Sequence, residues 1–336
     1  MAQPQQRISA HHRPEGGFRN PWPGAQMHGF LDFLKWSLIE RRRNPRRPDP
    51  DPAVFTRVAP SYVVPRGAPE LFTVTWVGHT TFLIQMGGLN VLTDPIWSER
   101  ASPVQFAGPK RWVPPAVDFD ALPPIDVILL SHDHYDHLDS STVSRLAKRY
   151  PAIRWYAPLG VEAFLRRHGA RDVVQSDWWD ESALGELRLT CLPAQHFSGR
   201  TLGQRNTTLW CGWALRTRTN SVFFAGDTAL HPDFATIATR CGPFDVAILP
   251  IGAYEPRWFM GSVHMNPEDC INAVDQLETA QNGAKLVMVA AHWGTFKLTD
   301  EPMDEPPIRM RELWLAAGRN SDALWIMRHG ETRTNP

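Results

Sequence analysis

After residue 70 the chain consists largely of short apolar runs, separated by turns that contain glycine, proline or polar residues. Runs of this kind predict strands, and Met86-Gly87-Gly88 between two of them predicts a hairpin turn. The predicted strands cover Thr73–Val77, Thr80–Gln85, Leu89–Thr93, Asp126–Leu130, Arg154–Ala157, Leu187–Leu192, Thr208–Leu215, Val222–Ala225, Val246–Leu249 and Leu286–Ala291.

Helical patterns lie between some of the predicted strands. Helices are predicted over Ser140–Tyr150, with Asp139 as the N-cap, and over Val161–His168. A third is predicted over Pro267–Leu277, with a proline in its first turn. Hairpins come first and strand–helix alternation follows, which is compatible with an α/β protein whose strands divide into two halves.

Residues 1–70 lack this pattern and are rich in proline, arginine and glutamine. The exception is an apolar stretch over 29–39, followed by Glu40-Arg41-Arg42-Arg43, which predicts a short amphipathic helix with a cationic end. Two interpretations stay open: the helix packs on the rest of the protein, or it lies on an anionic lipid surface. We divide the chain into an N-terminal arm, 1–70, and a main domain, 71–336. His11-His12 lies in the arm and is not counted as a metal site.

Composition narrows the class of protein. The 336 residues include 35 lysines and arginines against 35 aspartates and glutamates, which gives no reason to expect nucleic acid as a partner. The cysteines are widely spaced and form no CxxC pair, which argues against a disulfide scaffold or thiolate metal ligands. The N-terminus contains no signal-peptide core, and no apolar window is long enough for a spanning helix. We expect a cytoplasmic protein, with peripheral membrane contact left open.

The candidate chemistry begins in the segment Ser131–Leu138, directly after an apolar run. Its imidazoles and carboxylates are His132, Asp133, His134, Asp136 and His137. Imidazole and carboxylate together suit a borderline or hard divalent metal. A loop this rich in ligands can serve two adjacent ions, which points to hydrolysis.

Three further metal-competent residues, His196, Asp227 and His292, stand at or just after the ends of apolar runs, where a rigid strand can fix a ligand. A natural division assigns His132, His134 and His196 to one ion, assigns Asp136, His137 and His292 to the other, and lets Asp227 bridge both. A hydroxide shared between ions about 3.5–4 Å apart would be the nucleophile.

The spacing His132-x-His134-x-Asp136-His137 matches the HxHxDH motif of the metallo-β-lactamase superfamily. More narrowly, the chain resembles the N-acyl-phosphatidylethanolamine-hydrolysing phospholipase D family and its bacterial relatives, from about residue 70 to the C-terminus. The resemblance rests on Trp76–Thr81, Leu92–Ile96, Arg100–Pro103, Gly108–Arg111, Leu122–Asp126, Asp177–Trp179, Arg200–Leu202, Phe224–Thr228, Gly242–Asp245, Pro250–Met260, His292–Phe296 and Arg328–Glu331.

The resemblance implies an α/β fold of the four-layer αββα sandwich type, with the catalytic domain over 71–336 and the proposed ligands at the family's metal positions. It also implies two Zn²⁺ ions and cleavage of a phosphodiester, on the head-group side of an N-acyl glycerophospholipid. His264 falls where the family has an active-site histidine. Val263 replaces a polar amide there, Asp133 replaces an asparagine, and Ser198-Gly199 are smaller than their counterparts, which leaves the exact lipid open.

Roles can be assigned to individual residues. Asp136 is expected to orient the hydroxide as well as to bind metal, and His264 to donate a proton or hydrogen bond, unless it is a structural loop residue. Asp94 is expected either to accept a hydrogen bond from a ligand histidine or to form a turn before a proline. His79 is expected to be a buried, hydrogen-bonded neighbour of the site rather than a metal ligand. Arg257 either contacts phosphate or packs a loop.

Rival functions remain at this stage. A lactonase or a soluble phosphodiesterase on the same fold would use the same metal centre, and other divalent metals could replace zinc. A di-iron redox enzyme is disfavoured because that branch usually has glutamate where His134 stands. A non-catalytic metal-stabilised binding module is disfavoured because structural zinc sites are normally closed and single. The expected partner is a phospholipid or other phosphodiester substrate, and a homodimer is left open.

Overall fold

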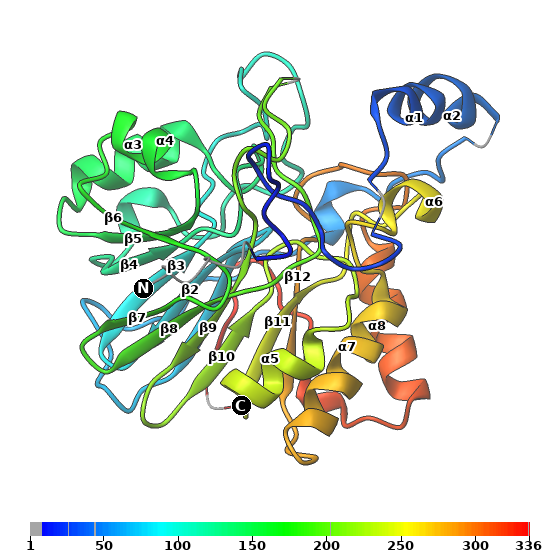
Figure 1. Cartoon of the computed structure of the whole chain (residues 1–336). Helices are drawn as coiled ribbons and strands as arrows, with labels where there is room; N and C mark the ends of the chain where they lie inside the picture. Colours follow the sequence, from blue (N-terminus) through cyan, green and yellow to red (C-terminus); the bar gives the residue numbers. More distant parts are fainter. Residues whose placement is uncertain (1–8, 26, 44, 202, 335) are drawn as a thin grey trace, which may run out of the picture.

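The computed structural model describes residues 9–25, 27–43, 45–201, 203–334 and 336. Within these residues the strands form two seven-stranded mixed sheets, which pack face to face and carry helices on both outer faces (Figure 1). The four-layer αββα sandwich is therefore confirmed. The helices of the main domain are α3 (Ser140–Arg149), α4 (Glu162–Arg167), α5 (Phe234–Cys241), α6 (Arg257–Met260), α7 (Pro267–Ala280) and α8 (Glu305–Ala316).

The first sheet has the strand order β14-β1-β2-β3-β4-β5-β6. Strands β14, β1, β2 and β3 pair antiparallel, whereas β3 to β6 pair parallel. The bounds are β1 (Thr73–Gly78), β2 (Thr81–Met86), β3 (Leu89–Thr93), β4 (Val127–Leu129), β5 (Arg154–Pro158), β6 (Asp172–Ser176) and β14 (Thr332–Thr334).

The second sheet has the order β13-β12-β11-β10-β9-β8-β7. Here β7 to β10 pair antiparallel, and β10 to β13 pair parallel. The bounds are β7 (Glu181–Leu184), β8 (Leu187–Leu192), β9 (Gly212–Arg216), β10 (Ser221–Phe224), β11 (Val246–Pro250), β12 (Val287–Ala291) and β13 (Leu324–Trp325).

Three apolar clusters hold the layers together. The central cluster lies between the sheets and includes Trp76, Phe82, Trp213 and Phe224. Residues of α3 and α4 pack against the first sheet in a second cluster, and residues of α5, α7 and α8 pack against the second sheet in a third. Both faces of most central strands are thus buried, which explains their nearly continuous apolar sequences.

The carboxyl ends of the central strands meet at one end of the sandwich. Segment 131–138 follows β4, and His292 follows β12 directly. In an open α/β sheet this end is where ligands bind, because the loops that leave the strands converge there. The fold therefore brings the predicted metal ligands to a single place.

The predicted strands and helices are found, and Asp139 and Pro267 occupy the predicted capping and first-turn positions. One boundary was wrong: β9 begins at Gly212 rather than Thr208, because the preceding residues cross between the sheets. Their backbone N–H groups donate to Leu159 and Ser131 of the first half. The structure also contains elements that the sequence pattern did not predict, namely β6, β7, β13, β14, α5, α6 and α8.

The arm contains a short helical segment at the ligand end of the sandwich. It consists of α1 (Phe30–Leu34), a π-helical stretch (Lys35–Glu40) and α2 (Arg41–Arg43), and it lies beside α6 (Figure 1). Trp36 is buried, and its Nε1 donates to Asp300 Oδ2 at 2.5 Å. The helix is thus docked on the main domain, as one interpretation expected. Residues 1–8 of the predicted arm lie outside the described residues.

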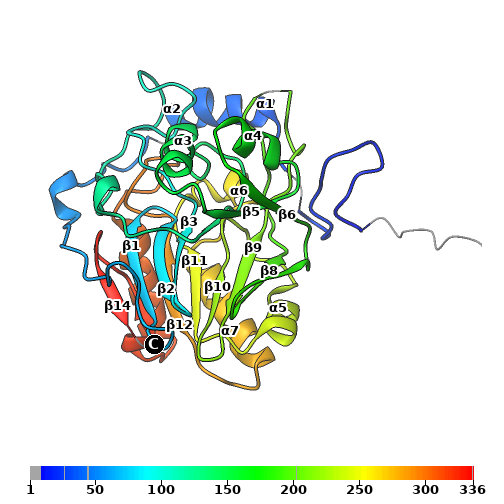
Figure 2. The ribbon, with the colours of Figure 1, turned by 90° about the vertical axis from the view of Figure 1, so that its left-hand side faces the viewer.

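The same segment leaves apolar side chains in solvent: Leu31 is 79% exposed, Leu38 is 54% exposed and Ile39 is 48% exposed. Figure 2 shows the segment running across the end of the sandwich, while the residues that precede it lie beside β6 and β8. Among the described residues, every helix falls short of the length and apolar character that crossing a bilayer requires.

The cap of α3 gives a test of how the ligand loop is anchored. Asp139 Oδ1 accepts from Ser141 N–H, and Oδ2 accepts from Thr142 Oγ1 at 2.5 Å and from Ser98 N–H at 3.1 Å. We expect Asp139→Ala to lower the free energy of unfolding by about 1–2 kcal/mol, measured by urea denaturation. Asp139→Asn retains a hydrogen-bond acceptor, so its free energy of unfolding should fall by less. Equal stability of Asp139→Ala and the wild type would contradict this anchoring.

Candidate metal centre

The predicted ligands converge at the carboxyl ends of strands from both sheets. The loop after β4 brings His132, His134, Asp136 and His137, and the other three come from segments that follow β8, β10 and β12. Close approach of two backbones makes this possible: at Gly226, just before Asp227, a Cβ atom would lie 2.6 Å from Ser131 Cβ. A side chain at Gly226 would therefore push the two ligand segments apart.

One group of three imidazoles faces a common point. His134 Nδ1 lies 2.8 Å from His132 Nε2 and 3.2 Å from His196 Nε2. All three rings are buried or nearly so. Burial, together with neighbouring histidines, lowers the pKa of His134 to about 3, and burial lowers the pKa of His196 to about 4. The rings are therefore neutral at physiological pH, as metal ligands must be.

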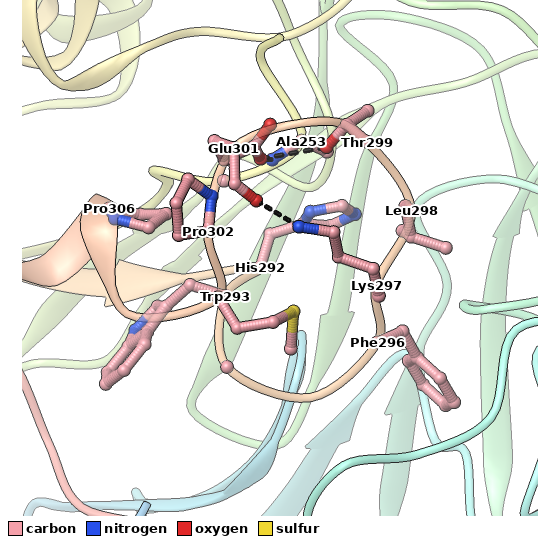
Figure 3. A pocket seen from close by; sticks show the side chains of 13 residues that line it. Ala253, His292, Trp293, Phe296, Lys297, Leu298, Thr299, Glu301, Pro302 and Pro306 are labelled. Atoms are coloured by element: carbon pink, nitrogen blue, oxygen red, sulfur yellow. Dashed lines mark hydrogen bonds between the residues drawn. The ribbon is translucent and has the colours of Figure 1, made fainter. Parts of the chain in front are cut away.

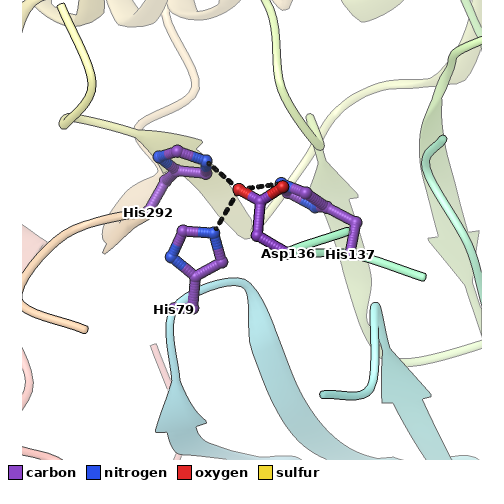
Figure 4. A group of neighbouring side chains, drawn as sticks. All are labelled: His79, Asp136, His137 and His292. Carbon is purple, nitrogen blue, oxygen red and sulfur yellow. Dashed lines mark hydrogen bonds and ion pairs between the residues drawn. The ribbon is translucent and has the colours of Figure 1, made fainter. Parts of the chain in front are cut away.

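A second group surrounds the carboxylate of Asp136 (Figure 4). Asp136 Oδ2 lies 3.0 Å from His79 Nε2, 3.4 Å from His137 Nε2 and 3.5 Å from His292 Nε2. His79 is buried and hydrogen-bonded beside the site, in the position that the sequence analysis expected. Its place in this group also lets it hold Asp136 toward the other two imidazoles.

Asp227 stands between the two groups. Its Oδ2 lies 3.1 Å from both His137 Nε2 and His292 Nε2, 3.8 Å from His196 Nε2 and 3.9 Å from His132 Nε2. Burial opposes its ionisation, but the attraction of the nearby imidazoles is stronger and keeps the pKa of Asp227 well below its usual range. A carboxylate in this place can bridge two cations.

Outer hydrogen bonds set which nitrogen of each ligand faces the centre. His137 Nδ1 donates to Asp94 Oδ2 at 2.8 Å, and His196 Nδ1 donates to the Val263 carbonyl at 2.9 Å. Ser131 Oγ donates to Asp94 Oδ2 at 2.6 Å and lies 2.8 Å from His132 Nδ1. Because the Nδ1 atoms are engaged, the Nε2 atoms of these rings are left for metal. Asp94 thus accepts a hydrogen bond from His137, one of the candidate ligands.

Buried polar atoms with few protein partners make the centre a candidate cation site. Asp227 Oδ1 is buried without a hydrogen-bond partner among the described residues, and the buried His137 Nε2 and His292 Nε2 contact carboxylate oxygens at 3.1–3.5 Å without a hydrogen bond of good geometry. Leaving such groups unsatisfied is costly, and a cation between them would satisfy them. Burial opposes protonation of His292, yet the attraction of Asp227 outweighs it and raises the pKa of His292 to about 9. The donor set, rich in imidazole and without thiolate, fits a binuclear site for borderline divalent metals.

His264 and Arg257 lie next to this centre. His264 is buried, its Nε2 is 4.0 Å from Asp227 Oδ2, and its Nδ1 has no hydrogen-bond partner in the part of the chain that the structure describes. The Arg257 guanidinium pairs with Asp269 at 2.7 Å and donates to the His264 carbonyl at 2.9 Å. Arg257 therefore holds the segment that carries His264, which is the loop-packing role of the two that the sequence left open.

A cavity of about 670 Å³ opens beside the centre. His134, Asp136, Asp227 and His264 form its polar floor. Its walls include apolar side chains from the arm, from the segment after His196, from α6 and from the loop after β12: Phe33, Trp36, Phe197, Phe259, Met260, Val263 and Leu298. The sequence analysis did not place the arm in this cavity, although the aromatic residues of its apolar stretch were a signal that it covers a surface.

The loop after His292 shapes the other side of the centre (Figure 3). The buried Glu301 carboxylate accepts from Ala253 N–H at 2.6 Å and from Thr299 Oγ1 at 2.8 Å. Lys297 Nζ donates to the Glu301 carbonyl at 2.5 Å. These bonds tie the loop that follows His292, whose φ of 61° is left-handed, to the segment at Ala253. The enclosed space here is about 20 Å³, too small for a substrate, so Glu301 is structural.

Comparisons with known proteins agree with this geometry. Residues 89–293 match the family model described as "Beta-lactamase superfamily domain". An uncharacterized protein of Mycobacterium tuberculosis is 41% identical over 284 residues, which are 83% of this chain and 72% of that protein. The N-acyl-phosphatidylethanolamine-hydrolyzing phospholipase D 1 of Caenorhabditis elegans is 40% identical over 263 residues, which are 75% of this chain and 72% of that enzyme.

Among solved structures, an isothiocyanate hydrolase from Delia radicum gut bacteria superposes with a TM-score of 0.62. The alignment covers 78% of this chain and 98% of that one at 22% sequence identity, which supports the fold alone. The family match spans most of the two sheets and includes all the proposed ligands. The chain therefore belongs to the metallo-β-lactamase superfamily, as a metal-dependent hydrolase whose homologues include N-acyl-phosphatidylethanolamine-hydrolysing phospholipases D.

Proposed function

We propose that this protein is a zinc-dependent phosphodiesterase that cleaves the head-group phosphodiester of a glycerophospholipid, with an N-acylated phospholipid as the first candidate. The observation that carries the proposal is the cavity beside the metal centre, whose floor is polar and whose walls are apolar. A soluble phosphodiester has little apolar surface to bury against such walls, whereas burial of a lipid's acyl chains there would favour binding. The 40% identity to the nematode enzyme supports the same reaction.

When bound, two zinc ions would lower the pKa of a water ligand and offset the charge that develops on the phosphoryl oxygens. Asp136 lines the cavity and is held by His79, so its carboxylate can accept a hydrogen bond from the attacking water and orient it. His264 faces the same space. Burial holds the pKa of His264 well below its usual range, so its neutral ring can donate a hydrogen bond to the substrate.

A cation on the cavity wall suits the phosphate. Arg205 lines the cavity, and its guanidinium carbon lies 5.2 Å from the centre of the Phe197 ring. Arg200 also lines the cavity, but its guanidinium donates to the backbone carbonyls of Asp133 and Leu138. These bonds engage Arg200 with the loop that carries the candidate ligands. We assign phosphate contact to Arg205 rather than to Arg257, because the latter is paired with Asp269.

The cavity adjoins a surface suited to a membrane. Leu31, Leu38 and Ile39 of the arm are exposed beside the exposed cations Arg42 and Arg43. The helical segment is joined to α6 by a hydrogen bond from Trp258 Nε1 to Glu40 Oε2 at 2.6 Å. Apolar side chains next to cations are typical of segments that lie on anionic lipid, so we propose that this surface brings the cavity to the bilayer.

The first prediction concerns His264. We expect His264→Ala to lower kcat by about 100-fold or more with little change in zinc content, because a donor aimed at the reacting group is lost while the ligands remain. Steady-state turnover and metal analysis of the same preparation measure both quantities. His168→Ala, at the end of α4, is the matched control and should behave as the wild type. Full turnover by a zinc-loaded His264→Ala protein would reject this role.

The second prediction concerns the substrate class. On a panel of phospholipid micelles, lactones and soluble phosphodiesters, the wild type should prefer the lipid. Phe259→Ser should lower kcat/KM for the lipid by about 10- to 100-fold, because roughly 1.5–3 kcal/mol of apolar burial is lost. It should leave soluble phosphodiesters nearly unaffected. Phe106→Ser, at an 85% exposed position away from the cavity, is the control. A preference for lactones, or equal losses on both phosphodiesters, would refute the lipid assignment.

The third prediction concerns the membrane surface. We expect Leu38→Glu to weaken binding to anionic phospholipid vesicles about tenfold in a sedimentation assay, because one apolar side chain is lost and a repelled charge is added. Ile308→Glu places the same change on α8 at a 50% exposed position, outside this surface, and should bind like the wild type. Equal binding by Leu38→Glu and the wild type would count against the surface.

A further inference from the structure

A second histidine–carboxylate cluster lies outside the hydrolytic centre. His11 Nε2 lies 2.7 Å from Asp177 Oδ1, and His12 Nε2 lies 2.7 Å from Asp177 Oδ2. The histidines belong to the arm, whereas Asp177 follows β6, on the side where Figure 2 shows the arm beside the sheet. All three ligand atoms fall within 4.8 Å of one another. No metal site was predicted at these histidines from the sequence, because they lie in the N-terminal arm, which was expected to be mobile.

The two imidazoles are held in place by packing. The ring of His11 is buried and stacks on Trp178, with centroids 4.1 Å apart, and the ring of His12 meets the edge of Phe18 at 5.1 Å. The backbone around them is also tied down, since Phe18 N–H donates to the Asn206 carbonyl at 2.8 Å. Both Nε2 atoms therefore face Asp177 before any ligand arrives, which reduces the ordering cost of binding one.

The carboxylate is charged and reachable. Partial burial opposes ionisation of Asp177, but the hydrogen bonds from His11 and His12 are stronger and hold its pKa below the usual range. The side chains of His12 and Asp177 are 30% and 26% exposed, so a cation can enter from solvent and a water molecule can complete its coordination. Two imidazoles, one carboxylate and one water form a four-coordinate ligand set that zinc accepts.

We propose that His11, His12 and Asp177 form a third metal site, for zinc or a similar borderline divalent cation, that clamps the N-terminal arm to the main domain. The site is structural and takes no part in the hydrolytic step.

The clamp acts on a segment that reaches the hydrolytic centre. Beyond His12 the arm continues to Asn20, whose Nδ2 donates to the carbonyl of His196 at 2.9 Å. Trp22 then stacks on His231 with centroids 4.4 Å apart, and Trp36 further along lines the cavity. A metal at the clamp thus fastens the stretch of chain that leads to one wall of the cavity.

The experiment is a count of bound zinc on the full chain. Metal-stripped protein is dialysed against a zinc buffer of fixed free concentration, and bound zinc is measured by atomic emission. We expect three equivalents in the wild type and two in the His11→Gln/His12→Gln double variant. Asp227→Asn, which disrupts the hydrolytic centre, should still retain the equivalent at the clamp. Two equivalents in the wild type, or no difference in the double variant, would overturn the proposal.

Trypsin cleavage after the exposed Arg19 gives a second readout that needs no activity. Zinc should slow this cleavage several-fold in the wild type and in Asp227→Asn, but not in the double variant. Asp177→Asn, which keeps the shape of the side chain, should behave like the double variant and guards against a folding defect. Protection by zinc that persists in Asp177→Asn would show that the three side chains are only hydrogen-bonded to one another.

Discussion

Burial of the carboxylates among imidazoles is the constraint on which the rest of the structure depends. Asp227 lies within 4 Å of ring nitrogens from both groups of histidines, in a place that water barely reaches. A carboxylate there needs positive charge close by, and the surrounding nitrogens can coordinate the same cations. Metal binding and the stability of this end of the sandwich are therefore linked, since loss of the ions leaves buried polar atoms unpaired.

The sandwich holds these buried polar residues in fixed positions. Strands buried on both faces supply rigid carriers, and the outer hydrogen bonds of Asp94 and Ser131 direct ring nitrogens inward without entering the centre themselves. The arm contributes differently: it has little regular structure, yet it supplies Trp36 to the cavity wall and apolar side chains to the surface beside it. The sheets thus position the metal-binding residues, whereas the arm lines the cavity through which a substrate would reach them.

The central strands, and the clustering of the candidate ligands at their ends, could be predicted from sequence because their signals are local. A buried strand is an apolar run, and a ligand at its end is a polar residue in a fixed position. The edge strand β7 was missed because its alternating burial leaves Glu181 and Ala183 exposed, and α8 was missed because Pro306 and Pro307 in its first turn resemble a loop. The role of Arg257 was undecidable, since it depends on Asp269 and on the His264 carbonyl, contacts that no pattern encodes. The covering of the cavity by the arm is likewise a tertiary contact.

Anomalous X-ray scattering at the zinc edge, from crystals of the zinc-loaded protein, tests the central claim most directly. The account predicts two peaks at the ligand end of the sandwich. One should lie about 2.0–2.2 Å from nitrogens of His132, His134 and His196, the other at similar distances from Asp136, His137 and His292, with Asp227 touching both. A single peak there, or none, with Asp227 turned away from these histidines, would contradict it.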